Sequence, residues 1–495
     1  MPPRALPLPH FTLPPLAGED YLFVAALRSH LSSSPPPAAA SLSRFLPCLT
    51  PLRLAHLLLQ LARPALAQGF PHGLLAALLP SPPPPLPFAI LIHSLPPRRC
   101  AELLASVLPS VSPHAFPDLL HHVLLTARLA SGPRLPAAAA AVAVPALDVL
   151  FSACARSQKL SRATLAYRAM RAHGLLPAVA SCNVFISAAL RLRRPEIAVS
   201  FFREMRRGRI SPNVYTANMV MRAFCAMGQV ADAALVLDEM SDWGVGRTAA
   251  SFNTLIAAYC RDSGGMEPAL RLKERMEREG LAPDEVTYNT IVHGLCKEGR
   301  MRQANRVVSE MRVKGVAPNT VTYNTLIYGY VKLGDSEAVS RVHEEMVKAG
   351  VGVNMVTYNA LILGLCNEGK MRKAGRLVQQ LCTAKLEPNA STFAALIVGQ
   401  CKKQNSERAL DLLNAMKKSG FHPNYDAYKI VVSTFCKNKD FEGAVDVMKD
   451  MLGRCMAPDK ALLHEFFEGL SEAKKLHLAA DLRSVANGER LIPDV

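Results

Sequence analysis

"VTYNTIVHGLCKEGRM" (residues 286–301), "VTYNTLIYGYVKLGDS" (321–336) and "VTYNALILGLCNEGKM" (356–371) are three copies of one phrase, each beginning 35 residues after the one before. A phrase that recurs at a fixed interval of this length is typical of proteins built from stacked structural repeats. The chain of 495 residues is long enough for many such repeats.

One copy, residues 285–319, has the pattern of two helices. Apolar residues follow the i, i+3, i+4 spacing of one helix face in two successive stripes: Tyr288, Ile291, Val292, Leu295 and Cys296, then Met301, Ala304, Val307, Val308 and Met311. We expect Thr287 to cap the first helix, Gly299 to end it, and Gly315 with Pro318 to end the second. An isolated pair cannot bury both stripes, so the prediction is an all-α fold, a right-handed superhelical solenoid of antiparallel helix pairs.

The same pattern extends well beyond the three clear copies. We expect an array over 144–495 of about nine repeats and a degenerate C-terminal unit, with one extra residue in the repeat at 249–284. The repeats are expected at 144–178, 179–213, 214–248, 249–284, 285–319, 320–354, 355–389, 390–424 and 425–459, and the degenerate unit at 460–494.

The N-terminal part has a different composition. Of the 37 prolines, 27 lie in residues 1–147. Residues 1–30 open with the acid-free stretch "MPPRALPLPHFTLPPL", which is compatible with an organelle-targeting leader and equally with a plain disordered, proline-rich leader. Residues 31–143 form a Pro/Ala/Leu-rich region for which we expect degenerate helices, among them 53–70 and 116–130. Arginine or proline interrupts the apolar runs, so no membrane span is expected.

Charge and cysteine spacing narrow the possible functions. The formal net charge is +17, which favours a polyanionic partner such as nucleic acid or an anionic membrane. No C-x-x-C occurs, and six cysteines mark one slot of the repeat, so we expect them to be small buried residues and not metal ligands: Cys225, Cys260, Cys296, Cys366, Cys401 and Cys436.

The period of 35, the phrase V-T-Y-N-T-L-I-x-G-L-C-K and the ending E-M-x-x-x-G-x-x-P-[DN] closely resemble pentatricopeptide repeats. The resemblance covers residues 144–494 and is to the plain class of the family, whose members act in plant organelles. It implies a sequence-selective single-stranded RNA-binding protein in which one repeat reads one base.

The resemblance also implies which side chains read the bases: the fifth and the last residue of each repeat. The reading pairs are Asn183 with Asn213, Asn218 with Thr248, Asn253 with Asp284, Asn289 with Asn319, Asn324 with Asn354, and Asn359 with Asn389. Asn with Asp resembles the family's uracil-preferring pair, Asn with Asn its cytosine/uracil pair, and Asn with Thr also favours pyrimidine. The pairs Asp148–Ala178, Ala394–Asn424, Lys429–Asp459 and His464–Asp494 give no assignment, and Arg247 and Val353 replace the proline before two last positions.

A structural alternative is that the fifth-position asparagines only cap or turn the helix start. Ala394, Lys429 and His464 fill the same slot without disturbing the surrounding pattern, so folding does not require asparagine there. An amide both donates and accepts hydrogen bonds, which suits an uncharged base edge.

Two further slots fit a single-stranded groove. The resemblance assigns Val286, Val321 and Val356, at the second position, to clamping bases between repeats. The other slot holds cations, which would contact phosphates or would simply suit the C-terminal end of a helix. These cations are Arg191, Arg261, Lys297, Lys332, Lys402 and Lys437.

We expect no enzymatic activity, no cofactor and no bound metal. His343 and Glu345 form an H-x-E without the C-x-x-C that a deaminase needs. The alternative to RNA binding is a protein-binding scaffold whose groove receives a peptide. The family resemblance favours the mitochondrion, with the chloroplast as the alternative.

Overall fold

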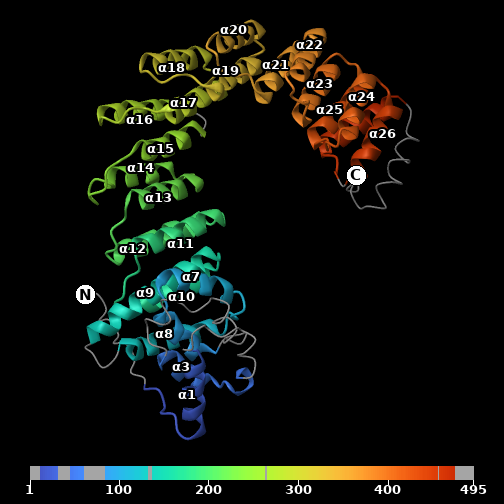
Figure 1. Cartoon of the computed structure of the whole chain (residues 1–495). Helices are drawn as coiled ribbons and strands as arrows, with labels where there is room; N and C mark the ends of the chain where they lie inside the picture. Colours follow the sequence, from blue (N-terminus) through green and yellow to red (C-terminus); the bar gives the residue numbers. More distant parts are fainter. Residues whose placement is uncertain are drawn as a thin grey trace. The chain divides into compact units, whose positions relative to one another are not determined.

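The computed structural model describes residues 12–31, 45–60, 84–131, 136–261, 265–454 and 456–473, and the regular elements in these ranges are all helices. The chain divides into two compact units, Met1–Leu255 and Ile256–Val495. Among the repeats of each unit, successive helix pairs lie side by side in chain order (Figure 1). The predicted all-α repeat fold is confirmed.

The first unit opens with short helices that precede the repeats. They are α1 (Glu19–Leu31), the 3-10 helix η1 (Leu46–Cys48), α3 (Pro51–Gln60), α6 (Pro85–Ser94), α7 (Pro97–Val107) and α8 (Phe116–Ser131). Disorder throughout residues 1–30 was therefore the wrong expectation for the second half of that range. Val24, Leu27 and Leu31 share one face of α1 and are buried, because their spacing of three and four residues forms a helical apolar stripe. Residues 1–11 lie outside the described part.

The repeats of the first unit follow as helix pairs. Their helices are α9 (Pro136–Arg156), α10 (Leu160–Ala172), α11 (Val179–Arg191), α12 (Pro195–Arg207), α13 (Val214–Ala226) and α14 (Val230–Glu239). α9 begins before the expected repeat boundary at 144 and contains Pro145. The alanine-rich sequence ahead of that proline has high helix propensity, which explains the early start.

The second unit continues the same architecture, and the division between the units falls within α15 (Ala249–Arg261). Its further helices are α16 (Met266–Arg278), α17 (Glu285–Lys297), α18 (Met301–Val313), α19 (Thr320–Leu333), α20 (Ser336–Lys348), α21 (Met355–Asn367), α22 (Met371–Thr383), α23 (Ala390–Lys402), α24 (Ser406–Lys418), α25 (Tyr425–Lys437), α26 (Phe441–Leu452) and α27 (Lys460–Glu472). The expected C-terminal unit at 460–494 is described only through residue 473.

The two apolar stripes of repeat 285–319 are buried as the pattern predicts, on α17 and on α18. Gly299 and Gly315 end these helices with positive φ angles of 73° and 80°, a conformation that glycine adopts without steric cost. The expected cap was wrong by three residues. Asp284 is the N-cap of α17, and Thr287 is the third helical residue in a reciprocal capping box with it.

Neighbouring repeats approach closely where glycine meets cysteine and methionine. A Cβ added to Gly399 would lie 2.6 Å from Sδ of Met371 and 2.7 Å from Cβ of Cys366. Gly329 has the same relation to Met301 and Cys296, at 2.8 and 3.0 Å. Cys296 and Cys366 therefore each pack against the glycine of the following repeat, where a larger residue would not fit.

The cysteine slot is largely buried, as expected. Cys296, Cys366, Cys401 and Cys436 are buried, and Cys225 and Cys260 are half-buried. Burial raises the pKa of the Cys296 and Cys366 thiols to about 12. These thiols behave as apolar packing groups.

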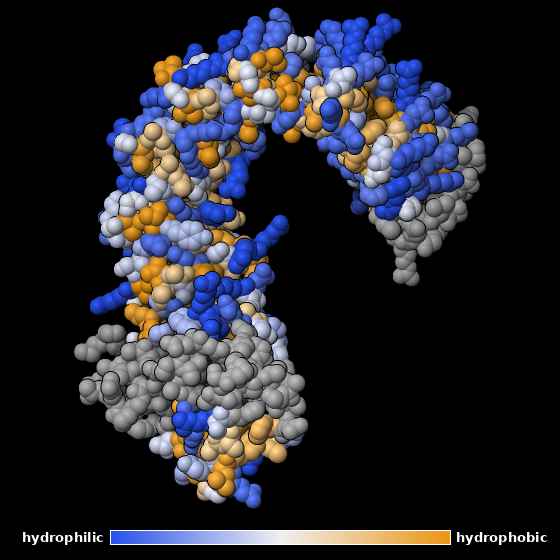
Figure 2. Space-filling view, viewed as in Figure 1, coloured by the Kyte–Doolittle hydropathy of each residue, from blue (hydrophilic) through white to orange (hydrophobic). Residues whose placement is uncertain are grey.

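The face of the molecule seen in Figure 2 is mostly hydrophilic over α20 and α22, in keeping with apolar stripes that point inward. Of the helices described, none combines the length and apolar content needed to cross a bilayer.

Candidate nucleic-acid interface

Four of the six expected reading pairs are joined by a direct hydrogen bond. In each, Nδ2 of the fifth-position asparagine donates to Oδ1 of the last-position asparagine. The distances are 3.2 Å for Asn183–Asn213, 3.5 Å for Asn289–Asn319, 3.3 Å for Asn324–Asn354 and 3.1 Å for Asn359–Asn389. Residues 30 positions apart in the chain thus meet at the start of the next repeat.

A buried threonine of the following repeat holds each of these asparagines. Its hydroxyl donates to the asparagine Oδ1 in the contacts Thr216–Asn183 (2.7 Å), Thr322–Asn289 (2.6 Å), Thr357–Asn324 (2.7 Å) and Thr392–Asn359 (2.6 Å). With Oδ1 directed at the hydroxyl and Nδ2 at the partner asparagine, both ends of the amide are assigned. The amide of the fifth-position asparagine is therefore preoriented.

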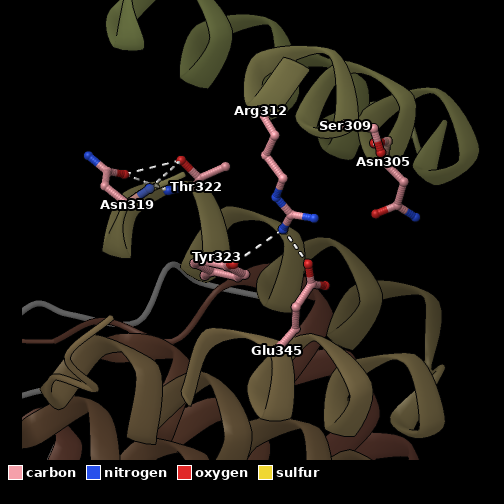
Figure 3. A network of polar contacts seen from close by, with 7 residues as sticks. All are labelled: Asn305, Ser309, Arg312, Asn319, Thr322, Tyr323 and Glu345. Carbon is pink, nitrogen blue, oxygen red and sulfur yellow. Dashed lines mark hydrogen bonds and ion pairs between the residues drawn. The ribbon is translucent and has the colours of Figure 1, made fainter. Parts of the chain in front are cut away.

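Helix capping belongs to the last-position residue and not to the fifth. Asn319 is the N-cap of α19: its Oδ1 accepts from the backbone N–H of Thr322 at 3.0 Å, and its own N–H donates to the Thr322 hydroxyl (Figure 3). Its Nδ2 also donates to Glu285. The last-position residues with such a capping box are Asn213, Asp284, Asn319, Asn354 and Asn389. The fifth-position asparagines lie inside the first helix, so the capping alternative does not apply to them.

One of the six fifth-position asparagines is less exposed than the others. The Asn183 residue is only 6% exposed. The other five readers are half-buried: Asn218, Asn253, Asn289, Asn324 and Asn359. The amide of repeat 179–213 is therefore the least accessible of the six.

The expected pair Asn218–Thr248 has a different connection. Oδ1 of Asn218 accepts from the Ser251 hydroxyl at 2.7 Å, and that hydroxyl lies 3.1 Å from Oγ1 of Thr248, so a serine connects this pair. Asn253 and Asp284 belong to different compact units and are described separately. Oδ1 of Asp284 accepts from the N–H of Thr287 at 2.8 Å.

Arg247 and Val353 stand where other repeats have a proline before the last position. After Val353, Asn354 caps α21 with the same capping box as its equivalents. Arg247 directs its Nε to the carbonyl of Leu237 at 2.8 Å and so satisfies the C-terminal end of α14.

Two unassigned slots are occupied by charges. Asp148 accepts from the N–H of Ala178 at 2.9 Å and from the Ser181 hydroxyl at 2.8 Å, which ties it to the start of α11. Because Ala178 has no capping side chain, Asp148 serves the helix start instead. Lys429 and Asp459 form an ion pair of 2.7 Å in the slot of repeat 425–459.

The side chains expected to clamp bases are apolar and exposed to solvent. Val286, Val321 and Val356 are 58%, 56% and 60% exposed. The sequence interpretation missed Tyr215, which is 58% exposed and holds the same second position in repeat 214–248. Counting that position through every repeat identifies it.

The six expected phosphate-contacting cations are all exposed at the C-terminal ends of the first helices: Arg191, Arg261, Lys297, Lys332, Lys402 and Lys437. Lys297 donates to the carbonyl of Arg261 at 2.7 Å, so the helix-end interpretation describes part of its role. Nζ of Lys332 lies 5.7 Å from the ring centre of Tyr328. Arg156, exposed in the same slot of repeat 144–178, was missed.

A separate polar network connects the second helices of repeats 285–319 and 320–354. Arg312 on α18 donates to the Tyr323 hydroxyl at 3.2 Å and also pairs with Glu345 on α20 (Figure 3). Glu345 thus has a structural partner, and burial lowers the pKa of the nearby His343. Among the residues that the structure describes, no three His, Cys, Asp or Glu side chains come together as a candidate metal site.

Comparison with solved structures finds a pentatricopeptide repeat protein from maize and a yeast protein. PPR10 from maize is 20% identical over 96% of this chain and 90% of its own, with a TM-score of 0.44. PPR10 in complex with an 18-nt psaJ RNA element is 19% identical, covering 96% and 83%, with a TM-score of 0.47. Yeast Rmd9p in complex with a 16-nt target RNA is 10% identical, covering 94% and 96%, with a TM-score of 0.33. No curated protein matches.

The family comparison is more direct. The model described as the PPR repeat family matches residues 177–226, 214–261, 247–297, 283–332, 318–367, 353–402 and 388–437. A second model, described as the PPR repeat, matches residues 426–456. These overlapping matches cover more than half of the chain and follow the helix pairs described above. The chain therefore belongs to the PPR repeat family.

Proposed function

We propose that this protein binds single-stranded RNA sequence-selectively, reading one base per repeat, and acts by occupying its site without chemistry. The observation that carries the proposal is the recurrence of one preoriented amide pair, with the same threonine contact, in four repeats. A fixed donor and acceptor at regular intervals is what recognition of successive base edges requires.

The surroundings of these pairs suit a polyanionic, aromatic ligand. Exposed valines flank three of the readers, where they would contact the faces of bases. Exposed cations at the ends of the first helices would meet the phosphates. The net charge of +17 adds a general attraction for RNA.

The identities of the readers define a target. Under the family resemblance, repeats 179–389 read six adjacent nucleotides, 5′ to 3′ along the protein, as pyrimidine-pyrimidine-U-pyrimidine-pyrimidine-pyrimidine. The uracil corresponds to Asn253 with Asp284. The resemblance further favours a plant organelle, the mitochondrion before the chloroplast, with a role in RNA processing, stability, splicing or translation.

The test is selection of binders from a randomised RNA pool by the full chain. Wild type should enrich the pyrimidine run, and Asn289→Ala should weaken a matched strand about five-fold or more, with the loss traceable to one nucleotide. Asn253→Thr, which leaves Asp284 in place, should move the third nucleotide from uracil towards guanine under the family's pairing rule.

Asn305→Ala is the matched control, since Asn305 lies on the second helix of the same repeat as Asn289 and contacts Tyr330. It should bind as wild type does. Enrichment of purines opposite the asparagine run would contradict the reading assignment. A pull-down that recovers a peptide and no RNA would favour the scaffold alternative.

A further inference from the structure

The slot of repeat 425–459 contains two opposite charges in the positions of a reading pair. Lys429 is the fifth residue of the repeat and Asp459 the last, and Nζ lies 2.7 Å from Oδ2. This contact joins the same two positions as the asparagine–asparagine bonds of four other repeats. The Lys429 and Asp459 side chains are 41% and 42% exposed, so a ligand can reach both.

The two carboxylate oxygens of Asp459 make different contacts. Oδ1 accepts from the N–H of Leu462 at 2.7 Å and caps α27. Oδ2 contacts Lys429, and the carboxylate also takes a hydrogen bond from the Tyr425 hydroxyl. The Tyr425 hydroxyl accepts from the Asp459 N–H at 3.0 Å, which fixes the backbone at this point.

The pair is ionised under ordinary conditions. The hydrogen bond from Lys429 holds the pKa of the Asp459 carboxyl below its usual range, and the same bond raises the pKa of the Lys429 ammonium. Nζ of Lys429 also lies 6.0 Å from the ring centre of Tyr425. A strong donor and a strong acceptor therefore stand side by side.

Guanine offers this arrangement more hydrogen bonds than the other bases do. Guanine places its O6 acceptor next to the N1–H and N2–H donors, so an ammonium can donate to O6 while a carboxylate accepts from both N–H groups. Uracil offers a similar acceptor and a single N–H. Cytosine and adenine each offer one amino donor beside one ring-nitrogen acceptor, so guanine alone presents two adjacent donors to the carboxylate together with an acceptor for the ammonium.

We propose that the Lys429–Asp459 pair makes repeat 425–459 a guanine reader. This inference rests on the proposed function. It assigns the eighth nucleotide of the target, counted from the one read by repeat 179–213, and leaves the seventh, opposite Ala394, unassigned. Exposed ion pairs contribute little to stability, so loss of this pair should leave the fold intact.

The experiment is the same pool selection, with the eighth nucleotide as readout. Wild type should prefer guanine there by roughly five-fold or more over each other base. Asp459→Asn should abolish that preference while keeping the α27 cap, because asparagine caps the equivalent helices at Asn319 and Asn354. Lys429→Asn recreates the Asn–Asp combination of Asn253 and Asp284 and should move the preference to uracil.

Lys437→Ala is the control within the same repeat. It removes an exposed cation outside the slot and should lower affinity for all sequences alike, with guanine still preferred. Enrichment of the pyrimidine run with a random eighth nucleotide, or with another base there, overturns the guanine assignment and leaves the proposed function standing. Failure to enrich any sequence overturns both.

Discussion

The Thr357 hydroxyl donates to Oδ1 of Asn324 over 2.7 Å, although the two residues lie 33 positions apart and on neighbouring helix pairs. Thr357 is also the capping-box partner of Asn354, the residue that accepts from Nδ2 of Asn324. The start of one repeat and the reader of the previous repeat therefore form one hydrogen-bonded unit. Stacking of the repeats and orientation of the readers depend on the same contacts.

Replacing Thr357 with the similarly shaped valine should affect both stability and reading. The change removes a hydroxyl from a buried site, so the free energy of unfolding should fall by about 1 kcal/mol. Selectivity for the nucleotide read by repeat 320–354 should also fall, because Asn324 loses its orienting donor. Urea denaturation and pool selection measure the two effects.

Thr325→Val serves as the matched variant, since the Thr325 hydroxyl donates to the Val321 carbonyl within its own helix, α19. Reading should be unchanged in it. If both variants lost selectivity equally, the orienting role of Thr357 would be excluded.

Lys297→Ala should weaken binding of every RNA to a similar extent. Removing one phosphate contact should also reduce the log–log salt dependence by roughly 0.7, the single-strand value. Lys314→Ala is the comparison, because Lys314 pairs with Glu277 beyond the end of α18. The affinity of both variants is measured between about 50 and 300 mM salt, a range that includes the physiological ionic strength. The slopes of the two variants should differ. Equal slopes for Lys297→Ala and wild type would exclude the phosphate contact.

Gly399→Ala should destabilise the second unit. The added methyl group would lie within 2.7 Å of atoms of Met371 and Cys366, and such overpacking costs about 1–3 kcal/mol. Gly375→Ala on α22 meets no atom within 4 Å and should stabilise the helix by roughly 0.5–1 kcal/mol. Opposite shifts of the denaturation midpoint are expected; two shifts of the same sign would contradict the close-packing account.

Alkylation at pH 8 should distinguish two cysteines of repeat 355–389. Burial raises the pKa of the Cys366 thiol to about 12, so its thiolate is scarce at that pH and increases only as the pH approaches 12. Cys382 is exposed and should react first. Mass spectrometry after iodoacetamide treatment gives the order, and urea should make the two equivalent. Equal rates in the folded protein would show that Cys366 is accessible.

The repeat period, the helix pairs, their apolar stripes and their glycine ends could all be predicted from the amino-acid sequence. These features depend on residues three or four positions apart or on single-residue conformational preferences, and such local rules are visible in one chain. The positions of the readers followed from family resemblance combined with that period.

The tertiary structure alone decided the contacts across repeat boundaries. It assigned the cap of α17 to Asp284 and not to Thr287. It also showed that Asn183 is buried and that Asp148 accepts a hydrogen bond at the start of the next repeat. It also joined Lys429 to Asp459. These residues lie about 30 positions apart or compete for one backbone group, so their contacts depend on how neighbouring helix pairs stack, which no local spacing rule specifies.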